Sequence, residues 1–284
     1  MNNQKKKELL EWVLPPKIQS YVIRTIERLI NYYTIDQSLF KKNSRIKDSE
    51  NKNRCFILGT GASTNRQDLS LLSREISIGI AGFFMHKDID IIKPKYYVVN
   101  SVFKLHGHIL EENKFVNWLK AMDETLDDST IMLLDASDKN KFEQYNLFTK
   151  KEIYWYQQEY YYKEEIKKID LQHLEKVASI SELAISVALH LGFDKIYMLG
   201  FDHNWFEDGA YFDNERYNKY FETDRAEVIE KNGFDNLYQM QGHAKIFYKY
   251  KQFQLIKKNI YNANSQQDSY VDTFPKVVYE NLFK

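Results

Sequence analysis

Residues 54–63 read RCFILGTGAS, an apolar run that breaks into a G-x-G-x-S turn. A short apolar run followed by glycines is typical of a buried strand whose backbone turns sharply at its carboxyl end. The glycines allow a phosphate or sugar to approach closely, and the hydroxyl of Ser63 can donate to that ligand or cap a following helix. The stretch therefore predicts the start of a nucleotide-binding α/β domain at Arg54, with Gly59, Thr60 and Gly61 in its first turn.

This turn lacks the third glycine of the dinucleotide-binding fingerprint, because Ser63 and Asn65 stand where the fingerprint would continue. A dehydrogenase is disfavoured for that reason, and a nucleotide-sugar or nucleoside-phosphate site is favoured. The alternative is an ordinary strand-to-helix turn that binds nothing.

The composition excludes several classes of protein. The chain has 284 residues, enough for one large core, and its 40 Lys and Arg balance 40 Asp and Glu, so no global field attracts nucleic acid. The single cysteine, Cys55, has no disulfide partner, and no Cys/His spacing resembles a zinc site. No segment approaches the roughly 18 consecutive apolar residues of a membrane span. We expect a cytoplasmic protein, with association with the inner face of the membrane left open.

An amphipathic helix is predicted before the domain, where residues 5–35 place apolar side chains on one broad face. This helix either packs on the domain or, with its lysines and arginines, lies on a membrane surface. Residues 41–53 are polar and lysine-rich, which indicates a linker. We therefore divide the chain into an N-terminal helical extension and linker, 1–53, and a catalytic domain, 54–284.

The rest of the chain alternates between apolar and helical segments. We expect a helix over 68–73, strands over 76–81, 96–101 and 131–135, a helix over 179–192, and a strand from 195 that ends in GFDHN, residues 200–204. This pattern predicts a Rossmann-like, mostly parallel sheet with helices on both faces. The aromatic-rich residues 142–172 are interpreted as an insertion, with a lid over a sugar site as the alternative.

Polar residues follow several of the expected strands, at the edge where open α/β sheets bind ligands. Asn100 ends one strand, Asp202, His203 and Asn204 end another, and Ser179 and Ser181 begin the helix between them. The sequence therefore predicts a ligand site at the carboxyl edge of the sheet.

Five segments resemble, in the same order, the motifs of bacterial lipooligosaccharide sialyltransferases that use CMP-activated sialic acid. They are GTGAS at 59–63, Asn100-Ser101, the helix at 179–192, IYMLGFD at 196–202 and GHAK at 242–245. The core and the tail, residues 260–263, 274–275 and 279–283, also resemble the 6-hydroxymethylpterin pyrophosphokinase-like domain of surface-polysaccharide loci. Together the two resemblances cover about residues 54–284.

The sialyltransferase resemblance implies specific roles. Gly59, Gly61 and Ser63 would lie under the nucleotide, Asn100 would contact the cytidine monophosphate, and Ser179 would bind the donor. Tyr211 would steady the leaving phosphate, and His243 would be the general base. The chain departs from the family near Gly82, at Val177 and at Asn204, where an asparagine, an arginine and an aromatic residue are expected.

The chemistry of an inverting sugar transfer points to the same residues, because it needs a base at the acceptor hydroxyl and stabilisation of the leaving phosphate. His243 and His203 are the candidate bases. No clear D-x-D follows an expected strand, so we expect no metal and no cofactor besides a CMP-linked nucleotide-sugar donor, with a surface glycan as acceptor. Two alternatives stay open: a pterin-type pyrophosphokinase that uses ATP and a divalent metal, and a non-catalytic nucleotide- or glycan-binding accessory protein. An oligomer is also left open.

Overall fold

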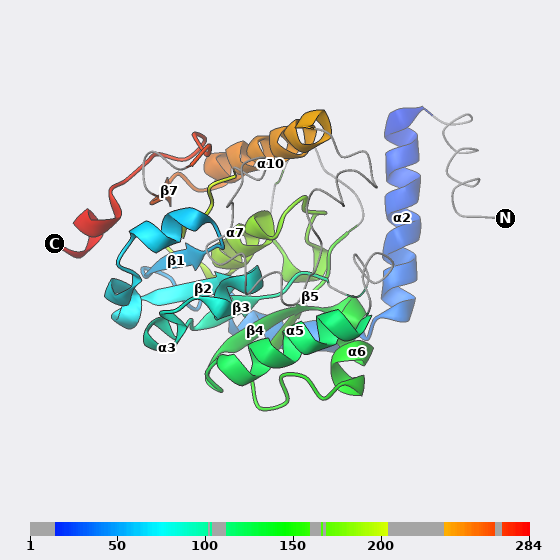
Figure 1. The fold of residues 1–284 in the computed structure, drawn as a ribbon. Coiled ribbons are helices and arrows are strands. Elements are labelled where there is room, and N and C mark those ends of the chain that lie inside the picture. The colour runs from blue at the N-terminus through cyan, green and yellow to red at the C-terminus, as the bar shows by residue number, and fades with distance from the viewer. Residues whose placement is uncertain are drawn as a thin grey trace.

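The centre of the molecule is a parallel sheet (Figure 1). The computed structural model describes residues 15–101, 103, 112–159, 166, 169–203, 236–264 and 269–284. In this part of the chain the sheet has seven strands in the order β5-β4-β3-β2-β1-β6-β7, and every pair is parallel. The strands are β1 Arg54–Leu58, β2 Ile76–Ile80, β3 Tyr96–Val98, β4 Ile131–Asp135, β5 Ile153–Tyr156, β6 Lys195–Leu199 and β7 Ile260–Asn262. The predicted α/β, Rossmann-like class is confirmed.

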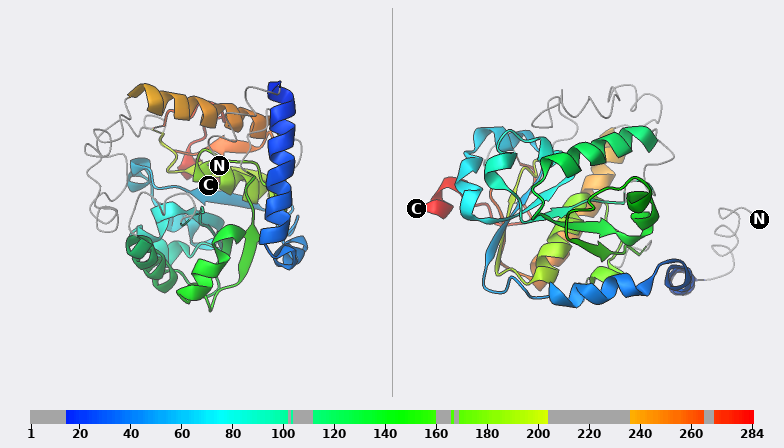
Figure 2. Two further views of the ribbon diagram at one scale, coloured as in Figure 1. Left: turned by 90° about the vertical axis from the view of Figure 1, so that its right-hand side faces the viewer. Right: turned by 90° about the horizontal axis from the view of Figure 1, so that it is seen from below.

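Helices cover both faces of the sheet, as expected (Figures 1 and 2). The α-helices are α2 Pro16–Thr34, α3 Ile89–Ile92, α5 Glu112–Thr125, α6 Lys139–Gln144, α7 Ile180–Leu191 and α10 Asn236–Ile256. Alternate residues of a strand point to opposite faces. Cys55 and Ile57 of β1 therefore join a core with α7 and α10, whereas Phe56 and Leu58 join a second core with α5.

Three local expectations need correction. The turn after β1 leads into two short 3-10 helices, Ala62–Arg66 and Leu69–Arg74, and not into an α-helix that Ser63 could cap. The stretch 142–172, expected to be an insertion, supplies the edge strand β5, in which Tyr154 and Tyr156 are buried, while residues 160–165, 167 and 168 lie outside the described residues. The strands β2 and β3 are shorter than the predicted ranges.

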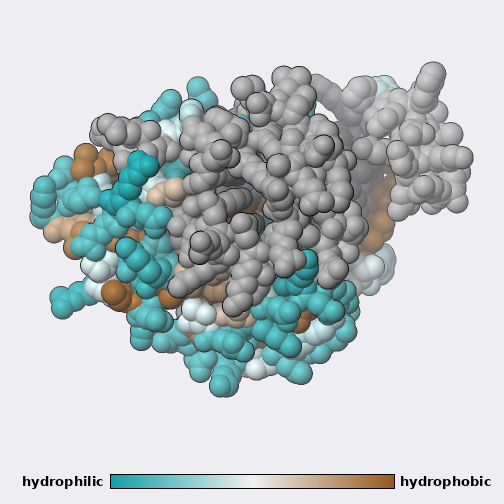
Figure 3. Space-filling model, viewed as in Figure 1, coloured by the Kyte–Doolittle hydropathy of each residue, from teal (hydrophilic) through white to brown (hydrophobic). Residues whose placement is uncertain are grey.

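Helix α2 stands at one side of the sheet (Figures 1 and 2). An ion pair attaches it, in which Nη2 of Arg28 lies 2.6 Å from Oε1 of the buried Glu159. Seven large apolar or aromatic side chains of α2 are exposed: Ile18, Tyr21, Ile26, Leu29, Ile30, Tyr32 and Tyr33. Within the described residues, no helix is both long and apolar enough to cross a membrane. Among the described atoms in Figure 3, hydrophobic residues of the sheet domain lie scattered between hydrophilic ones.

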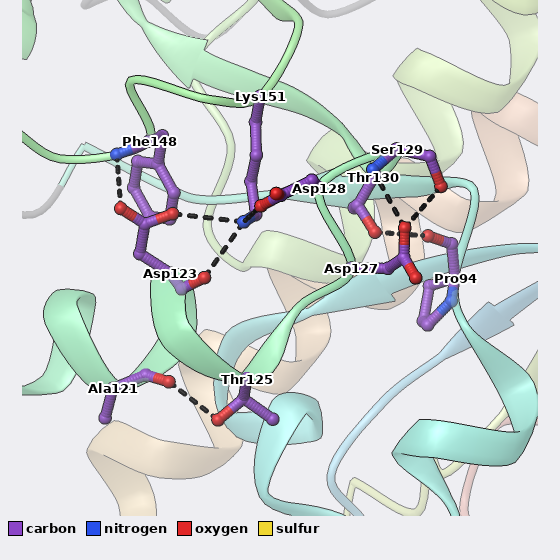
Figure 4. A network of polar contacts seen from close by, with 10 residues as sticks. All are labelled: Pro94, Ala121, Asp123, Thr125, Asp127, Asp128, Ser129, Thr130, Phe148 and Lys151. Carbon is purple, nitrogen blue, oxygen red and sulfur yellow. Dashed lines mark hydrogen bonds and ion pairs between the residues drawn. The ribbon is translucent and has the colours of Figure 1, made fainter.

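A buried lysine holds the amino end of the sheet together (Figure 4). Nζ of Lys151, just before β5, lies 3.1 Å from Oδ1 of Asp123 in α5 and 3.5 Å from Oδ1 of Asp128. The second carboxylate oxygen of Asp123 accepts a hydrogen bond from the N–H of Phe148 at 2.7 Å. This network fixes α5 against β4 and β5 at the edge opposite to the predicted ligand site.

Candidate functional site

The strand order reverses between β1 and β6. Strands β2 to β5 extend to one side of β1, and β6 and β7 lie on its other side. Ligands of open parallel sheets bind in the crevice at such a switch point, outside the carboxyl ends of the strands. The turn after β1 and the segment after β6, the two sharpest signals in the sequence, both leave the sheet at this point (Figure 1).

Glycines allow these two segments to touch backbone to backbone. The N–H groups of Gly59 and Gly61 donate to the carbonyls of Leu199 and Gly200 at 2.8 and 2.9 Å. A Cβ atom on Gly59 would lie 2.5 Å from the oxygen of Gly200, and one on Gly61 would lie 2.5 Å from Oδ2 of Asp202. Gly200 itself has a φ of +71°, which favours glycine. The space beside these glycines is thus filled by the protein, and contact of this turn with a phosphate stays a prediction.

Ser63 is bonded to Asp202 across the switch point. The carboxylate of Asp202 accepts hydrogen bonds from the backbone N–H of Ser63 at 2.8 Å and from its hydroxyl at 2.5 Å. Both residues are buried, with 1% and 2% of their surface exposed. Because the Ser63 hydroxyl donates its hydrogen bond to Asp202, its oxygen can only accept a hydrogen bond from a ligand. Thr60, between the two glycines, is half-buried.

The two candidate bases lie side by side. The rings of His203 and His243 are 5.8 Å apart, and the two residues are only 4% and 6% exposed. Burial, and to a lesser degree His243, lowers the pKa of His203 to about 3. Gly242 predicts a loop at His243 with a helix starting just after it, but this prediction is wrong, because His243 lies inside α10. Gly242 has open space beside it and costs a helix only about 1 kcal/mol, so it does not end α10.

A chain of hydroxyl groups connects His203 with the start of α7. The hydroxyl of the fully buried Tyr250, in α10, donates to Oγ of Ser181 at 2.6 Å and lies 2.9 Å from Nε2 of His203. Because this hydroxyl donates to Ser181, it accepts from His203, which places the imidazole proton on Nε2. Ser181 is also bonded to the half-buried Ser179. The structure thus brings three predicted residues together through a tyrosine that the sequence did not indicate.

Glu182 is a second residue that the sequence analysis missed. Its Oε2 accepts a hydrogen bond from the N–H of Ala178 at 2.9 Å, and the side chain is fully buried. Burial raises its pKa to about 8. The signal was available, since Ser179 and Glu182 have the S-x-x-E spacing of a helix start. The Ser179 side chain, however, makes no capping hydrogen bond at the start of α7, so its hydroxyl does not accept from the first backbone N–H groups of this helix.

Asn100 lies at the same edge of the sheet but two strands away from β1. It is half-buried, and its Oδ1 accepts hydrogen bonds from the N–H of Ser101 at 2.9 Å and from Nε2 of Gln158 at 2.8 Å. The described site residues therefore form one group at the switch point and a second position at the end of β3.

Tyr211 and Asn204 lie outside the described residues, so their predicted roles stay predictions. In the part of the chain that the structure describes, no group of three His, Cys, Asp or Glu residues could hold a metal ion. The two carboxylate oxygens of Asp202 both accept hydrogen bonds from Ser63.

The comparisons with known proteins find similarity among solved structures only. No protein-family model and no curated protein matches the chain. Among solved structures, it is similar to the sialyltransferase CstII from Campylobacter jejuni, in complex with a substrate analogue, cytidine-5'-monophosphate. The match has 12% sequence identity and a TM-score of 0.41, and it covers 80% of this chain and 85% of that chain. The likeness concerns the fold alone.

Proposed function

We propose that the chain is an inverting glycosyltransferase that transfers a sugar, sialic acid or a related acidic sugar, from a CMP-linked donor to a bacterial surface glycan. The observation that supports this most is the meeting of the histidine pair, the α7 serines and the glycine turn at the switch point of a parallel sheet. The motif resemblance supports the choice of CMP as the nucleotide.

In this proposal the donor phosphate lies near the start of α7. A helix of this length carries partial positive charge and N–H donors at its first turn, which favour an anion. Ser179 has no capping bond there and is half-buried, so a ligand can reach it. Tyr211 would add a hydroxyl to the leaving phosphate, as the resemblance implies.

His243 takes the proton of the acceptor hydroxyl in this proposal, and His203 positions it. A general base works best with a pKa near the working pH. The pKa of about 3 makes His203 a weak proton acceptor, and its Nε2 proton is directed to Tyr250. His203 instead packs edge-on against the ring of His243 and limits the positions of that ring.

Thermal-shift titration with CMP, CDP, UDP, GDP, and ATP with magnesium tests the donor. A ligand at about 100 times its Kd stabilises the native state by about 2.7 kcal/mol, a shift of several degrees for a chain of this size. CMP should give the largest shift. A larger shift with ATP and magnesium would favour the pyrophosphokinase, and no shift with any nucleotide would remove the proposal.

Transfer assays with His243→Ala test the base. We expect the rate to fall by about 10² to 10⁴-fold while CMP binding changes only a few-fold, because the base acts on the acceptor. Near-normal transfer by this variant would contradict the assignment, and a loss of folding would indicate a structural role.

We also propose that α2 contacts a membrane surface, because its apolar face is exposed in the folded chain. The full chain should bind vesicles that contain anionic lipid. Leu29→Glu combined with Ile30→Glu should abolish this binding and leave the fold intact, since both side chains are about half exposed. Ile91→Glu, in α3, is the matched control, because Ile91 is exposed to a similar degree. Equal vesicle binding by all three proteins would refute the contact.

A further inference from the structure

Three hydrogen bonds in series fix the Asn100 side chain. The backbone N–H of Ser101 donates to Oδ1 of Asn100 at 2.9 Å, and Nε2 of Gln158 donates to the same oxygen at 2.8 Å. The backbone N–H of Val177 donates to Oε1 of Gln158 at 3.4 Å. Gln158 therefore spans from the end of β3 to the segment just before α7.

The orientation of both amides follows from the two ends of this series. A side-chain amide can be turned over, but a backbone N–H can only donate. Ser101 thus requires the oxygen of Asn100, Val177 requires the oxygen of Gln158, and the nitrogen of Gln158 must face Asn100. Within the described residues, no acceptor is bonded to Nδ2 of Asn100, and the residue is half-buried at the open edge of the sheet.

We propose that Gln158 is a positioning residue that makes Asn100 present its amide N–H groups, and not its carbonyl oxygen, to the ligand of the carboxyl edge. The part of the ligand that meets Asn100 is then a hydrogen-bond acceptor, such as a phosphate oxygen, a ring carbonyl or an unprotonated ring nitrogen. The inference rests on the proposed function, which places a nucleotide at this edge.

A single nucleotide can reach both parts of the site. Adjacent strands lie about 4.8 Å apart, so the ends of β1 and β3 are separated by roughly 10 Å. An extended nucleoside monophosphate has this length. It can lie across the end of β2 with one end at the switch point beside β1 and the other at Asn100.

CMP binding to the full chain, measured by calorimetry, tests the role of Gln158. Gln158→Leu should weaken binding about 5- to 10-fold, because Asn100 loses the bond that orders it. Gln158→Glu keeps the shape but sets an acceptor against the oxygen of Asn100, so it should weaken binding at least as much. Gln172→Leu is the matched control, since Gln172 also donates from its amide to another amide, that of Gln37 at 2.8 Å. This control should bind CMP within two-fold of the unaltered chain. If Gln158→Glu binds CMP as the unaltered chain does, Gln158 only fills space.

Asn100→Asp tests the polarity of the contact. This change preserves both bonds to Oδ1 but replaces the presented N–H groups with a carboxylate oxygen. CMP binding should fall by about 100-fold or more, because a charged acceptor then faces an acceptor of the ligand. Binding within two-fold of the unaltered chain would overturn the proposal.

A second readout separates this inference from the proposed function. In the free chain, the side-chain amide signals of Asn100 in a ¹H–¹⁵N spectrum should shift in Gln158→Leu and stay unchanged in Gln172→Leu. If CMP does not bind the unaltered chain, the proposed function fails, whereas the amide signals still report on the positioning role. Asn100 signals that stay unchanged in Gln158→Leu would overturn that role.

Discussion

Replacing Tyr250 with phenylalanine removes one oxygen atom from the interior of the site. The hydroxyl of this fully buried residue bonds to Ser181 at 2.6 Å and to His203 at 2.9 Å, and thereby links α10, α7 and the end of β6. The ring packs against Phe274, with the ring centres 5.1 Å apart, and a phenylalanine retains this contact. The substitution therefore isolates the contribution of the two hydrogen bonds.

The expected loss follows from what remains in the interior. Ser181 keeps its hydrogen bond to Ser179, so the loss of the bond from Tyr250 to Ser181 lowers the free energy of unfolding by only about 1 kcal/mol, the net contribution of one neutral hydrogen bond. The N–H of His203 loses its acceptor, and a buried donor without an acceptor costs about 1–3 kcal/mol. We expect the free energy of unfolding to fall by about 2–4 kcal/mol and the melting temperature by roughly 5 °C.

Chemical denaturation and calorimetry at neutral pH measure this loss. Tyr248→Phe is the matched control, because Tyr248 lies in the same helix and is 60% exposed. This control should change the free energy of unfolding by less than about 0.5 kcal/mol. If Tyr250→Phe unfolds at the same denaturant concentration as the unaltered chain, or if the control is equally destabilised, the chain of hydroxyl groups does not stabilise the native state.

Two further substitutions test the buried carboxyl groups. Glu182 has a pKa of about 8 in the folded chain and an ordinary value of 4.5, so its contribution to stability is full below about pH 4.5 and is lost as the pH rises to about 8. In the unaltered chain the free energy of unfolding should fall with pH by at most about 1.4 kcal/mol per pH unit because of this group. Glu182→Gln should reduce that slope in denaturation measured at several pH values from about pH 5 to about pH 8. An unchanged slope would contradict the raised pKa. Asp202→Asn replaces one of the two oxygens that accept from Ser63 with an amide donor, so the free energy of unfolding should fall by about 2–3 kcal/mol in chemical denaturation. A loss below about 0.5 kcal/mol would show that the turn after β1 and the segment after β6 hold together without the carboxylate.

Local sequence was sufficient for the elements with the strongest apolar patterns. Strands buried on both faces need nearly continuous apolar residues, and β4 was predicted with its observed bounds, Ile131–Asp135. Gly192, with a φ of +84°, ends α7 as predicted. The alternation of these segments predicted the parallel sheet, and the rule for carboxyl edges placed Asn100 and Asp202 at one edge of it.

Other elements carried no such local signal. Strand β7 has only three residues and is held by pairing with β6, so nothing in its own sequence required it to be extended. The expected loop at His243 rested on Gly242, whereas tertiary packing on α7 retains the helix there. Short segments of this kind take their conformation from their neighbours.

The sequence by itself determined that a glycine turn, a serine helix and a strand ending in Asp202 and His203 belong to one α/β sheet. Only the tertiary structure decided how their side chains are used. Asp202 accepts both bonds of Ser63, 139 positions away, and Tyr250 lies between His203 and Ser181. Such contacts join residues far apart in the chain, and burial makes each hydrogen bond obligatory, because an unpaired polar group in the interior is costly. The partner of a buried polar group is therefore set by which elements the fold places beside it.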